Sequence, residues 1–259
     1  MEPQHDMSQF LNTRIVGGVE APREYGRHSA ALVFGEIMPH LMCGASIITE
    51  DHILTAAHCI DPLVIWGQLM PSARAVIGSN KWASTKKNIH FSGYVNHPNW
   101  NWSTLKNDIG ILILAERIRL SSDDSIDSHI IPLNYDWVDG GAECFVTGWG
   151  RLGVSSNIPD KLQLLYLNTI SPKQCFEGIR KASDGWFNVP PHDPKVEICT
   201  FHSVGHGMCN GDSGSALVRK DILQQIGIVS WGFPCAIGAP DVFVRIGGFK
   251  EWITSIIGK

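Results

Sequence analysis

The sequence lacks the long hydrophobic run that a membrane-spanning helix needs. No stretch approaches eighteen consecutive apolar residues, and Met1 to Phe10 is polar rather than a charged flank followed by an apolar core. We therefore expect no transmembrane helix and find no signal peptide in the sequence. Basic residues are not in excess either, because 21 Lys and Arg stand against 25 Asp and Glu, for a formal net charge of -4. Neither a nucleic acid nor a membrane is an expected partner.

Metal-binding motifs are also missing. The sequence contains no CxxC or HExxH pattern, and the spacing of its seven cysteines is not that of a zinc site. A metal-dependent hydrolase is therefore a poor interpretation, and we expect no metal and no cofactor. Seven is an odd number, so at most six cysteines can pair within the chain. Cysteines used as an oxidised framework indicate a secreted, extracellular protein.

Short β-like runs separated by glycine, proline and polar turns dominate the chain. With 259 residues, 44% of them hydrophobic, the chain is long enough for one globular unit with a large core. The pattern predicts an all-β sandwich or barrel, with a polar linker at Ser121 to Ser128 between two halves. Only Phe249 to Ile257 looks firmly helical, because apolar residues recur there at helical spacing. The clearest predicted strands are Ser29–Phe34, Arg74–Ile77, Ile109–Leu114, Cys144–Trp149, Gln225–Ser230 and Val242–Ile246.

Three short segments carry residues suited to acyl transfer. Hydrolysis of an amide by this route needs a nucleophilic hydroxyl, a base, a group that fixes the base, and donors for the oxyanion. In the TAAHC segment His58 is the candidate base, and Asp108, at the start of an apolar run, is the candidate group that orients it. Ser213, between glycines in the GDSGS segment, is the candidate nucleophile. The N–H groups of Gly211 and Ser213 are the candidate oxyanion hole.

Six segments in register resemble the chymotrypsin/trypsin family of serine proteases. They run in that family's order, with His58 before Asp108 and Ser213, and the resemblance covers Ile15 to the C-terminus. It implies a serine endopeptidase built from two six-stranded Greek-key antiparallel β-barrels and a C-terminal α-helix. The implied boundaries are 15–125 for the first barrel and 126–259 for the second barrel and the helix. The six segments are Ile15-Val16-Gly17-Gly18, TAAHC, DIGIL, Gly148-Trp149-Gly150, GDSGS and Ser230-Trp231-Gly232.

The resemblance also implies a zymogen. Arg14 before Ile15 supplies a cleavage site, so residues 1–14 look like a short activation peptide. In this family the residue matching Asp212 pairs with the freed N-terminus, although taken singly Asp212 is an ordinary turn aspartate. An activating protease is then an expected partner, besides protein or peptide substrates and protein inhibitors of proteases. A monomer is expected.

The family pattern implies three disulfides and leaves one cysteine over. Cys144 is the odd one, because Arg219 occupies the position of its usual partner, and we interpret it as a buried free thiol in preference to an intermolecular disulfide. A further departure is the lack of Asp or Glu from Ser79 to His90, which leaves the calcium loop of the trypsin branch unsupported. The implied pairs are Cys43–Cys59, Cys175–Cys199 and Cys209–Cys235.

Substrate preference is expected to depend on the S1 pocket. Its positions by resemblance are Gly207 at the base, Met208 on the wall, Gly232 at the entrance and Asp241 on a neighbouring strand. A trypsin-type enzyme has an aspartate at the base, so chymotrypsin-like or mixed specificity follows. The combination of a basal glycine with a displaced aspartate resembles arthropod chymotrypsins and brachyurin-type crab collagenases. Asp241 is equally open to a structural interpretation, as a carboxylate satisfied by backbone donors.

Other segments are expected at the rim of the cleft. Leu105, Ser230 and Trp231 match positions that contact the substrate backbone or form subsites upstream of the scissile bond. The long loop between Cys175 and Cys199, which holds three prolines, is expected to be a rigid insertion. Asn101-Trp102-Ser103 is a glycosylation sequon whose occupancy stays open.

A catalytically silent homologue that acts as a binding or regulatory protein is the main alternative to an active protease. The complete set of His58, Asp108 and Ser213 argues against it. The physiological substrate and pathway stay open at this stage.

Overall fold

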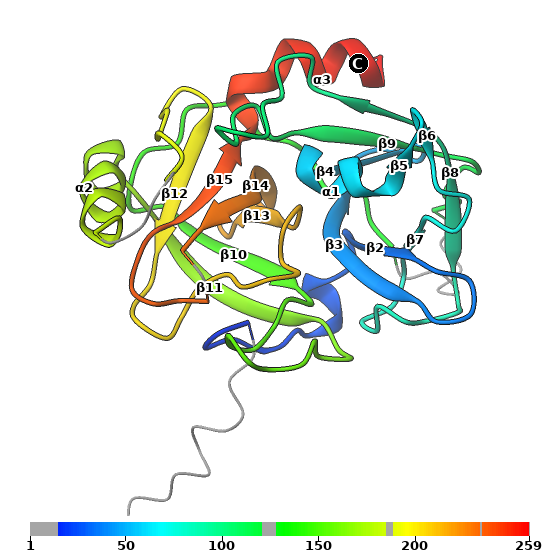
Figure 1. Ribbon diagram of the computed structural model, residues 1–259, viewed down its shortest axis with the longest axis horizontal. Coiled ribbons are helices and arrows are strands. Elements are labelled where there is room, and N and C mark those ends of the chain that lie inside the picture. Colours follow the sequence, from blue (N-terminus) through cyan, green and yellow to red (C-terminus); the bar gives the residue numbers. More distant parts are fainter. Residues whose placement is uncertain (1–14, 121–127, 185–188, 234, 259) are drawn as a thin grey trace, which may run out of the picture.

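Two closed β-barrels lie side by side in the computed structural model, which describes residues 15–120, 128–184, 189–233 and 235–258 (Figure 1). The expected activation peptide, 1–14, lies outside the described residues, and so does the expected linker except for Ser128. The predicted architecture of two six-stranded antiparallel barrels is confirmed.

The first barrel closes through strands in the order β2, β3, β4, β9, β8 and β7. β9 is buried at four of its five positions, as expected of a continuous apolar run whose two faces are both covered. A separate hairpin of β5 and β6 follows the first helix. The strand bounds are β2 Ser29–Phe34, β3 His40–Ile47, β4 His52–Thr55, β5 Val64–Ile65, β6 Gln68–Leu69, β7 Arg74–Val76, β8 Asn88–Asn96 and β9 Gly110–Leu114.

The second barrel closes because β11 pairs with both β10 and β12. Its order is β11, β10, β13, β14, β15 and β12, and the short β1 adds to β11. In β11 the exposed Tyr166 and Asn168 alternate with buried residues, which is the period of a strand with one face in the core. The bounds are β1 Val19–Glu20, β10 Glu143–Gly148, β11 Gln163–Ile170, β12 Glu197–Phe201, β13 Ala216–Arg219, β14 Gln224–Gly232 and β15 Asp241–Arg245.

The helices differ from the prediction in one respect. All six predicted strands are present with ends within two residues and the C-terminal helix is confirmed, but α2 was not among the segments identified as helical. α2 has a capping box, in which the Gln174 N–H donates to Ser171 Oγ and the Ser171 N–H donates to Gln174 Oε1. Its apolar stripe is thin, because only Cys175 and Ile179 are buried. The helix bounds are α1 Ala57–Ile60, α2 Pro172–Ala182 and α3 Lys250–Ile257, with 3-10 turns η2 Arg23–Tyr25, η3 Asp61–Leu63 and η4 Ile246–Phe249.

The ends of the described chain cross to opposite barrels. β1 pairs with β11 of the second barrel, although 15–125 was expected to form the first. α3 instead packs on the first barrel, where the His97 ring after β8 lies 5.1 Å from Phe249 and 5.3 Å from Trp252. Figure 1 shows α3 next to β9, whereas α2 lies on the outer side of the second barrel beside β12. β1, first in the chain, thus pairs with the second barrel, and α3, last in the chain, packs on the first.

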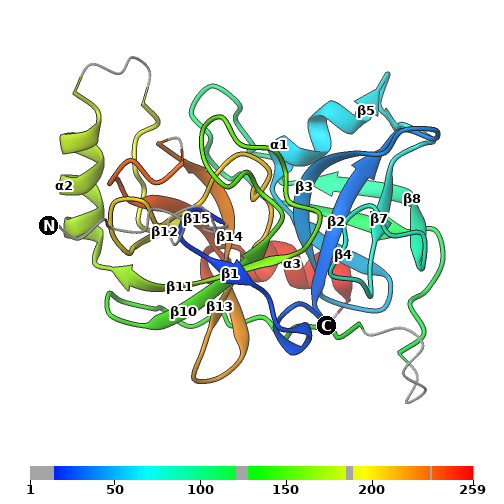
Figure 2. The same ribbon diagram turned by 90° about the horizontal axis from the view of Figure 1, so that it is seen from below.

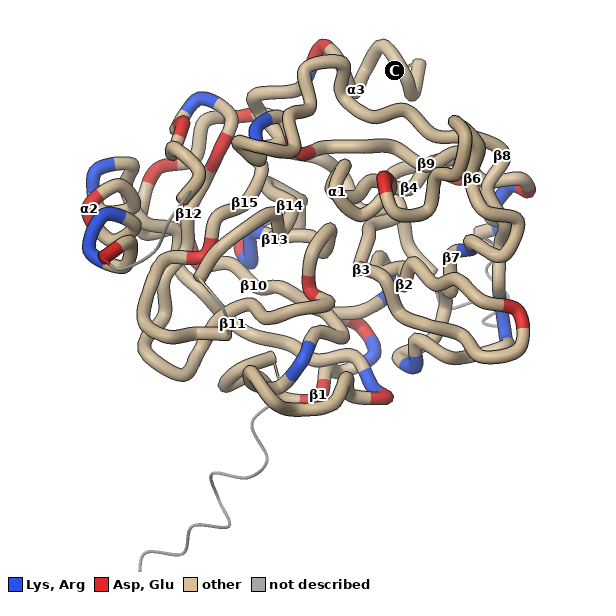
Figure 3. The backbone as a smooth tube through the Cα atoms, viewed as in Figure 1, with Lys and Arg blue, Asp and Glu red and all other residues tan. Residues whose placement is uncertain are grey.

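α1 and the β5–β6 hairpin lie on the upper side of the molecule in Figure 2. Charges of both signs are interspersed along the chain in Figure 3. Within the described residues, no helix combines the length and the apolar character needed to cross a bilayer.

Candidate active site

His58 and Asp108 are brought together by the pairing of β4 with β9. His58 is in α1, directly after β4, and Asp108 precedes β9; Thr55 at the end of β4 is opposite Gly110 at the start of β9. His58 Nδ1 lies 2.7 Å from Asp108 Oδ2, and the His58 backbone N–H donates to Oδ1 at 2.9 Å. The carboxylate therefore fixes the orientation of the imidazole.

Asp108 has a further partner from the second barrel. Its side chain is fully buried, and Ser230 Oγ in β14 donates to Oδ2 at 2.6 Å. Ser230 was expected only among residues that contact the substrate, so its hydrogen bond to Asp108 was missed. Three hydrogen bonds to one buried carboxylate hold it in a fixed orientation.

The environment of His58 favours the protonated imidazole. Burial alone would lower the pKa of His58, but the charge and hydrogen bond of Asp108, with a smaller effect of Asp61, raise it above 6.5. Asp61 is itself held by Asn96 and Trp100. A raised pKa makes the imidazole a stronger base, which suits it to take a proton from a nucleophile.

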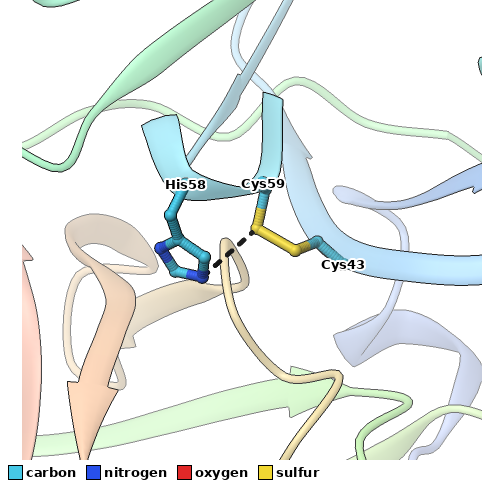
Figure 4. A group of neighbouring side chains, drawn as sticks. All are labelled: Cys43, His58 and Cys59. Carbon is cyan, nitrogen blue, oxygen red and sulfur yellow. Dashed lines mark hydrogen bonds between the residues drawn. A yellow bond between two sulfur atoms is a disulfide. The ribbon is translucent and has the colours of Figure 1, made fainter. Parts of the chain in front are cut away.

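The other imidazole nitrogen points toward a disulfide. His58 Nε2 lies 3.7 Å from Cys59 Sγ, which is bonded to Cys43 (Figure 4). These three side chains are close enough to share a metal ion, as are His192, Cys175 and Cys199. Both sets contain a disulfide, so neither offers the thiolates that a metal would take as ligands.

The GDSGS loop places Ser213 between the two barrels. Its carbonyl accepts from Gly44 N–H of β3 at 2.8 Å, and Ser213 itself lines a cavity of the second barrel. Within the described residues no hydrogen bond joins Ser213 Oγ to His58 Nε2. Such a bond is often long in a substrate-free active site and closes when substrate binds.

The backbone of this loop suits an oxyanion hole. Gly211 has φ +101°, and a Cβ there would lie 3.1 Å from Gly150 Cα, so only glycine fits. Arg151 N–H donates to the Asn210 carbonyl at 2.8 Å, which anchors the loop. The N–H groups of Gly211 and Ser213 have no acceptor among the described residues, which leaves both able to bind an oxyanion.

Asp212 turns away from this loop into the protein. It is completely buried, with Oδ1 accepting from Gly150 N–H at 2.8 Å and Oδ2 from Cys209 N–H at 3.0 Å. A Cβ on Gly148 or Gly150 would lie within 2.3 Å of the carboxylate, which explains both glycines of the Gly-Trp-Gly segment. Burial raises the pKa of Asp212 to about 7, since two backbone donors do not replace water fully.

Val16 pairs with the segment that leads to Cys209, one of the donors to Asp212. Ile15 is completely buried in the core of the second barrel, and the Gly207 N–H donates to the Val16 carbonyl at 3.1 Å. Gly207 is two residues before Cys209, a donor to Asp212. The start of the described chain is therefore joined to the segment that precedes the GDSGS loop, and Arg14 lies outside the described residues.

Three of the four predicted S1 residues line a cavity of about 210 Å³ that Ser213 also lines, and Gly207 is not among its lining residues. Met208, Gly232 and Asp241 line it. Asp241 Oδ2 accepts from Met208 N–H at 3.1 Å and would be 2.8 Å from a Cβ on Gly207, so the carboxylate occupies the space that a side chain at 207 would need. Burial raises the pKa of Asp241 to about 8. Both interpretations of Asp241 thus find support, because it has a backbone donor and also lines the pocket.

Several residues of the cavity were not expected from the sequence. Asn210, Val229 and Phe233 also line it, and each flanks a predicted site residue in the chain. Trp102, of the sequon, has its ring 6.4 Å from the His58 ring. Leu105 is half-buried and has φ +50°, and Trp231 is half-buried at the end of β14.

The described chain contains three disulfides, and they join the cysteines in the pairs that the resemblance implies, Cys43–Cys59, Cys175–Cys199 and Cys209–Cys235. Cys144 is a free thiol and fully buried, opposite Arg219 in the pairing of β10 with β13. Burial raises its pKa to about 12, so the thiol is unreactive.

Comparison with known proteins agrees with this geometry. The family model described as Trypsin matches residues 15–253. The chain is 33% identical over 242 residues to Chymotrypsin-2 of Vespa crabro, covering 92% of this chain and 98% of the relative. It is 30% identical over 254 residues to Trypsin-3 of Salmo salar, covering 95% of this chain and 94% of the relative. It is 31% identical over 247 residues to Duodenase-1 of Bos taurus, covering 95% of this chain and 90% of the relative.

The order of the site residues, the paired barrels and the match to this family model over nearly the whole described chain agree with one another. The chain therefore belongs to the trypsin family and is a serine endopeptidase.

Proposed function

We propose that the chain is a secreted zymogen whose cleaved form hydrolyses peptide bonds with His58, Asp108 and Ser213 as the catalytic triad and with mixed S1 specificity. The observation that carries the proposal is the hydrogen-bonded His58–Asp108 pair at the junction of the barrels, with Ser213 lining the adjacent cavity. The three disulfides support secretion, because such bonds persist in oxidising compartments.

The proposed mechanism uses each group once per acyl transfer. Ser213 Oγ attacks the substrate carbonyl while His58 Nε2 takes its proton, and the N–H groups of Gly211 and Ser213 bind the oxyanion. His58 then gives the proton to the leaving amine. Asp108 stabilises the imidazolium without taking a proton itself, since its carboxylate already accepts three hydrogen bonds. Water then attacks the acyl-enzyme by the same steps, with His58 again taking and giving the proton.

The buried Asp212 supports activation by cleavage. A carboxylate in these surroundings needs a cation, and cutting after Arg14 would create one as the α-amine of Ile15. The pair would hold the GDSGS loop and the S1 wall in place. An activating protease is accordingly a proposed partner, and protein inhibitors of proteases are proposed to bind the same cleft.

The S1 cavity supports two substrate classes. The space beside Gly207 is taken by Asp241, and Val229 and Phe233 add apolar lining for large side chains such as Phe, Tyr, Leu or Met, whose burial contributes about 25 cal/mol per Å². Asp241 supplies a carboxylate for Arg or Lys, as a second class. Leu105 and Trp231 are proposed to contact residues upstream of the scissile bond.

Replacement of the nucleophile tests the catalytic proposal. Ser213→Ala should abolish hydrolysis of chromogenic peptides in the cleaved protein while leaving the melting temperature unchanged, with only about 10³ to 10⁴ over the uncatalysed rate remaining. The rate of hydrolysis by His58→Ala should fall by a similar amount, because base and nucleophile act as a unit. Near wild-type turnover by Ser213→Ala would refute the triad, and an inactive wild type would favour a silent homologue.

Blocking the cut tests the zymogen proposal. Arg14→Gln should leave the chain uncut by a trypsin-type activator and inactive, whereas the wild type gains activity together with a new Ile15 N-terminus. N-terminal sequencing alongside the activity assay distinguishes the two states. Full activity from uncut Arg14→Gln protein would contradict the mechanism.

A further inference from the structure

A buried ion pair joins the two barrels near the substrate groove. Lys106 Nζ, from the segment between β8 and β9, lies 2.5 Å from Glu197 Oε1 of β12, across 91 positions of sequence. The two side chains are only 15% and 4% exposed. Removing two charges from water costs free energy, which their attraction offsets only when further hydrogen bonds satisfy the carboxylate.

Those further hydrogen bonds lead to the substrate groove. Trp231 Nε1 donates to the same Glu197 Oε1 at 2.9 Å, and Asp193 N–H donates to Oε2 at 2.7 Å. The Lys106 ammonium also lies 5.4 Å from the centre of the Trp231 ring. The ion pair thus holds this indole both at its single polar atom and at its ring.

The Lys106–Glu197 pair involves residues next to the proposed catalytic residues in the sequence, but it does not bind the Asp108 carboxylate. Lys106 is two residues before Asp108, and Trp231 follows Ser230. Asp108 nevertheless has its own donors, from the His58 backbone and from Ser230 Oγ. Loss of Glu197 should therefore disturb the indole and spare the acid that orients His58.

We propose that Glu197, together with Lys106, is a positioning residue that fixes the Trp231 indole as a wall for the substrate residues upstream of the scissile bond. This inference rests on the proposed function. An indole held in place before binding costs the substrate no ordering of that side chain. Only substrates long enough to reach the indole gain from this saving, so the effect of Glu197 on kcat/KM should depend on substrate length.

Two double variants isolate the hydrogen bond to the indole. K106M/E197Q and K106M/E197L both remove the two charges together, so that neither leaves a buried charge unpaired. They differ in that glutamine Oε1 can accept from Trp231 Nε1 and leucine cannot. Lys220→Met, which breaks the exposed pair of Lys220 with Glu143, is a matched control. The substrates are a single-residue amide and a tetrapeptide amide with the same Phe before the scissile bond.

The expected result is a loss that depends on substrate length. K106M/E197L should lower kcat/KM on the tetrapeptide about tenfold, mainly through KM, and change the single-residue amide by less than about twofold. K106M/E197Q should retain most of the tetrapeptide rate, and Lys220→Met should match the wild type on both. If the leucine variant does not fold, Trp231→Phe removes the indole N–H and should show the same dependence on length.

Equal losses on both substrates, or no loss on either, would overturn the positioning role while leaving the proposed protease function intact. A cleaved, folded wild type that hydrolyses neither substrate would instead overturn the proposed function, and the inference with it.

Discussion

Two aspartates, Asp212 and Asp241, both have carboxylates that are buried away from water, but their surroundings differ. Asp212 is completely buried and has two backbone donors, whereas Asp241 is 7% exposed, has one donor from Met208, and lines the S1 cavity. Burial raises the pKa of Asp212 to about 7 and that of Asp241 to about 8. Each carboxylate is therefore incompletely satisfied until a cation arrives.

The difference lies in which cation can reach each carboxylate. Asp212 is sealed inside the protein, and the segment before its donor Cys209 pairs with Val16, so we expect its cation to come from the chain itself. Asp241 opens on the pocket beside Ser213, so we expect its cation to come from the substrate. Asp212 would then control activation of the zymogen and Asp241 the choice of substrate, and three experiments test this contrast.

The largest expected effect is at Asp212. In the cleaved protein Asp212→Asn should lower kcat/KM on every substrate by about 10² to 10⁴, because removing one partner of a buried ion pair costs about 3 to 5 kcal/mol. N-terminal sequencing first confirms that the protein begins at Ile15. The loss of kcat/KM is then measured on an Arg and a Phe substrate. A loss confined to one substrate would contradict a role in activation.

A smaller and selective effect is expected at Asp241. Asp241→Asn should lower kcat/KM for Arg and Lys substrates by roughly 10-fold to 100-fold, the effect of a charged hydrogen bond worth about 1.5 to 3 kcal/mol. Phe and Leu substrates should be spared, since asparagine keeps an oxygen for the Met208 N–H. Matching losses on Phe and Arg would show instead that Asp241 is structural.

The smallest expected effect is a change of preference with pH. Because the pKa of Asp241 is raised to about 8, its carboxyl is neutral below that pH and attracts an arginine only above it. The ratio of kcat/KM for an Arg substrate to that for a Phe substrate should therefore rise as pH increases through about 8. Titration of His58 and of the Ile15 amine affects both substrates and cancels in the ratio.

Asp241→Asn is the control for this measurement and should make the ratio independent of pH. A wild-type ratio that stays flat from about pH 6 to about pH 9 would show that the carboxylate does not select the substrate cation.

Strand positions and reacting groups followed from short stretches of sequence. The apolar run of β9 and the alternation in β11 are local patterns, and all six predicted strands end within two residues of the observed ones. α2 was missed because its signal is the capping pair of Ser171 and Gln174, whereas the prediction depended on an apolar stripe that this helix hardly has.

The Glu197–Lys106 pair could not have been predicted in the same way. The residues are 91 positions apart, neither belongs to a catalytic segment, and a single Lys or Glu usually indicates a solvated surface. Only the packing of β12 against the segment before β9 makes them partners.

The candidate reacting groups and their order along the chain could be predicted from sequence alone, since residue type and the freedom of Gly211 at positive φ are local properties. Only the tertiary structure decided that Asp241 lines the cavity, that Cys144 is buried opposite Arg219, and that β1 and α3 cross to opposite barrels. These outcomes depend on which distant strands pair and which faces lose water, and burial then sets the pKa of each enclosed acid.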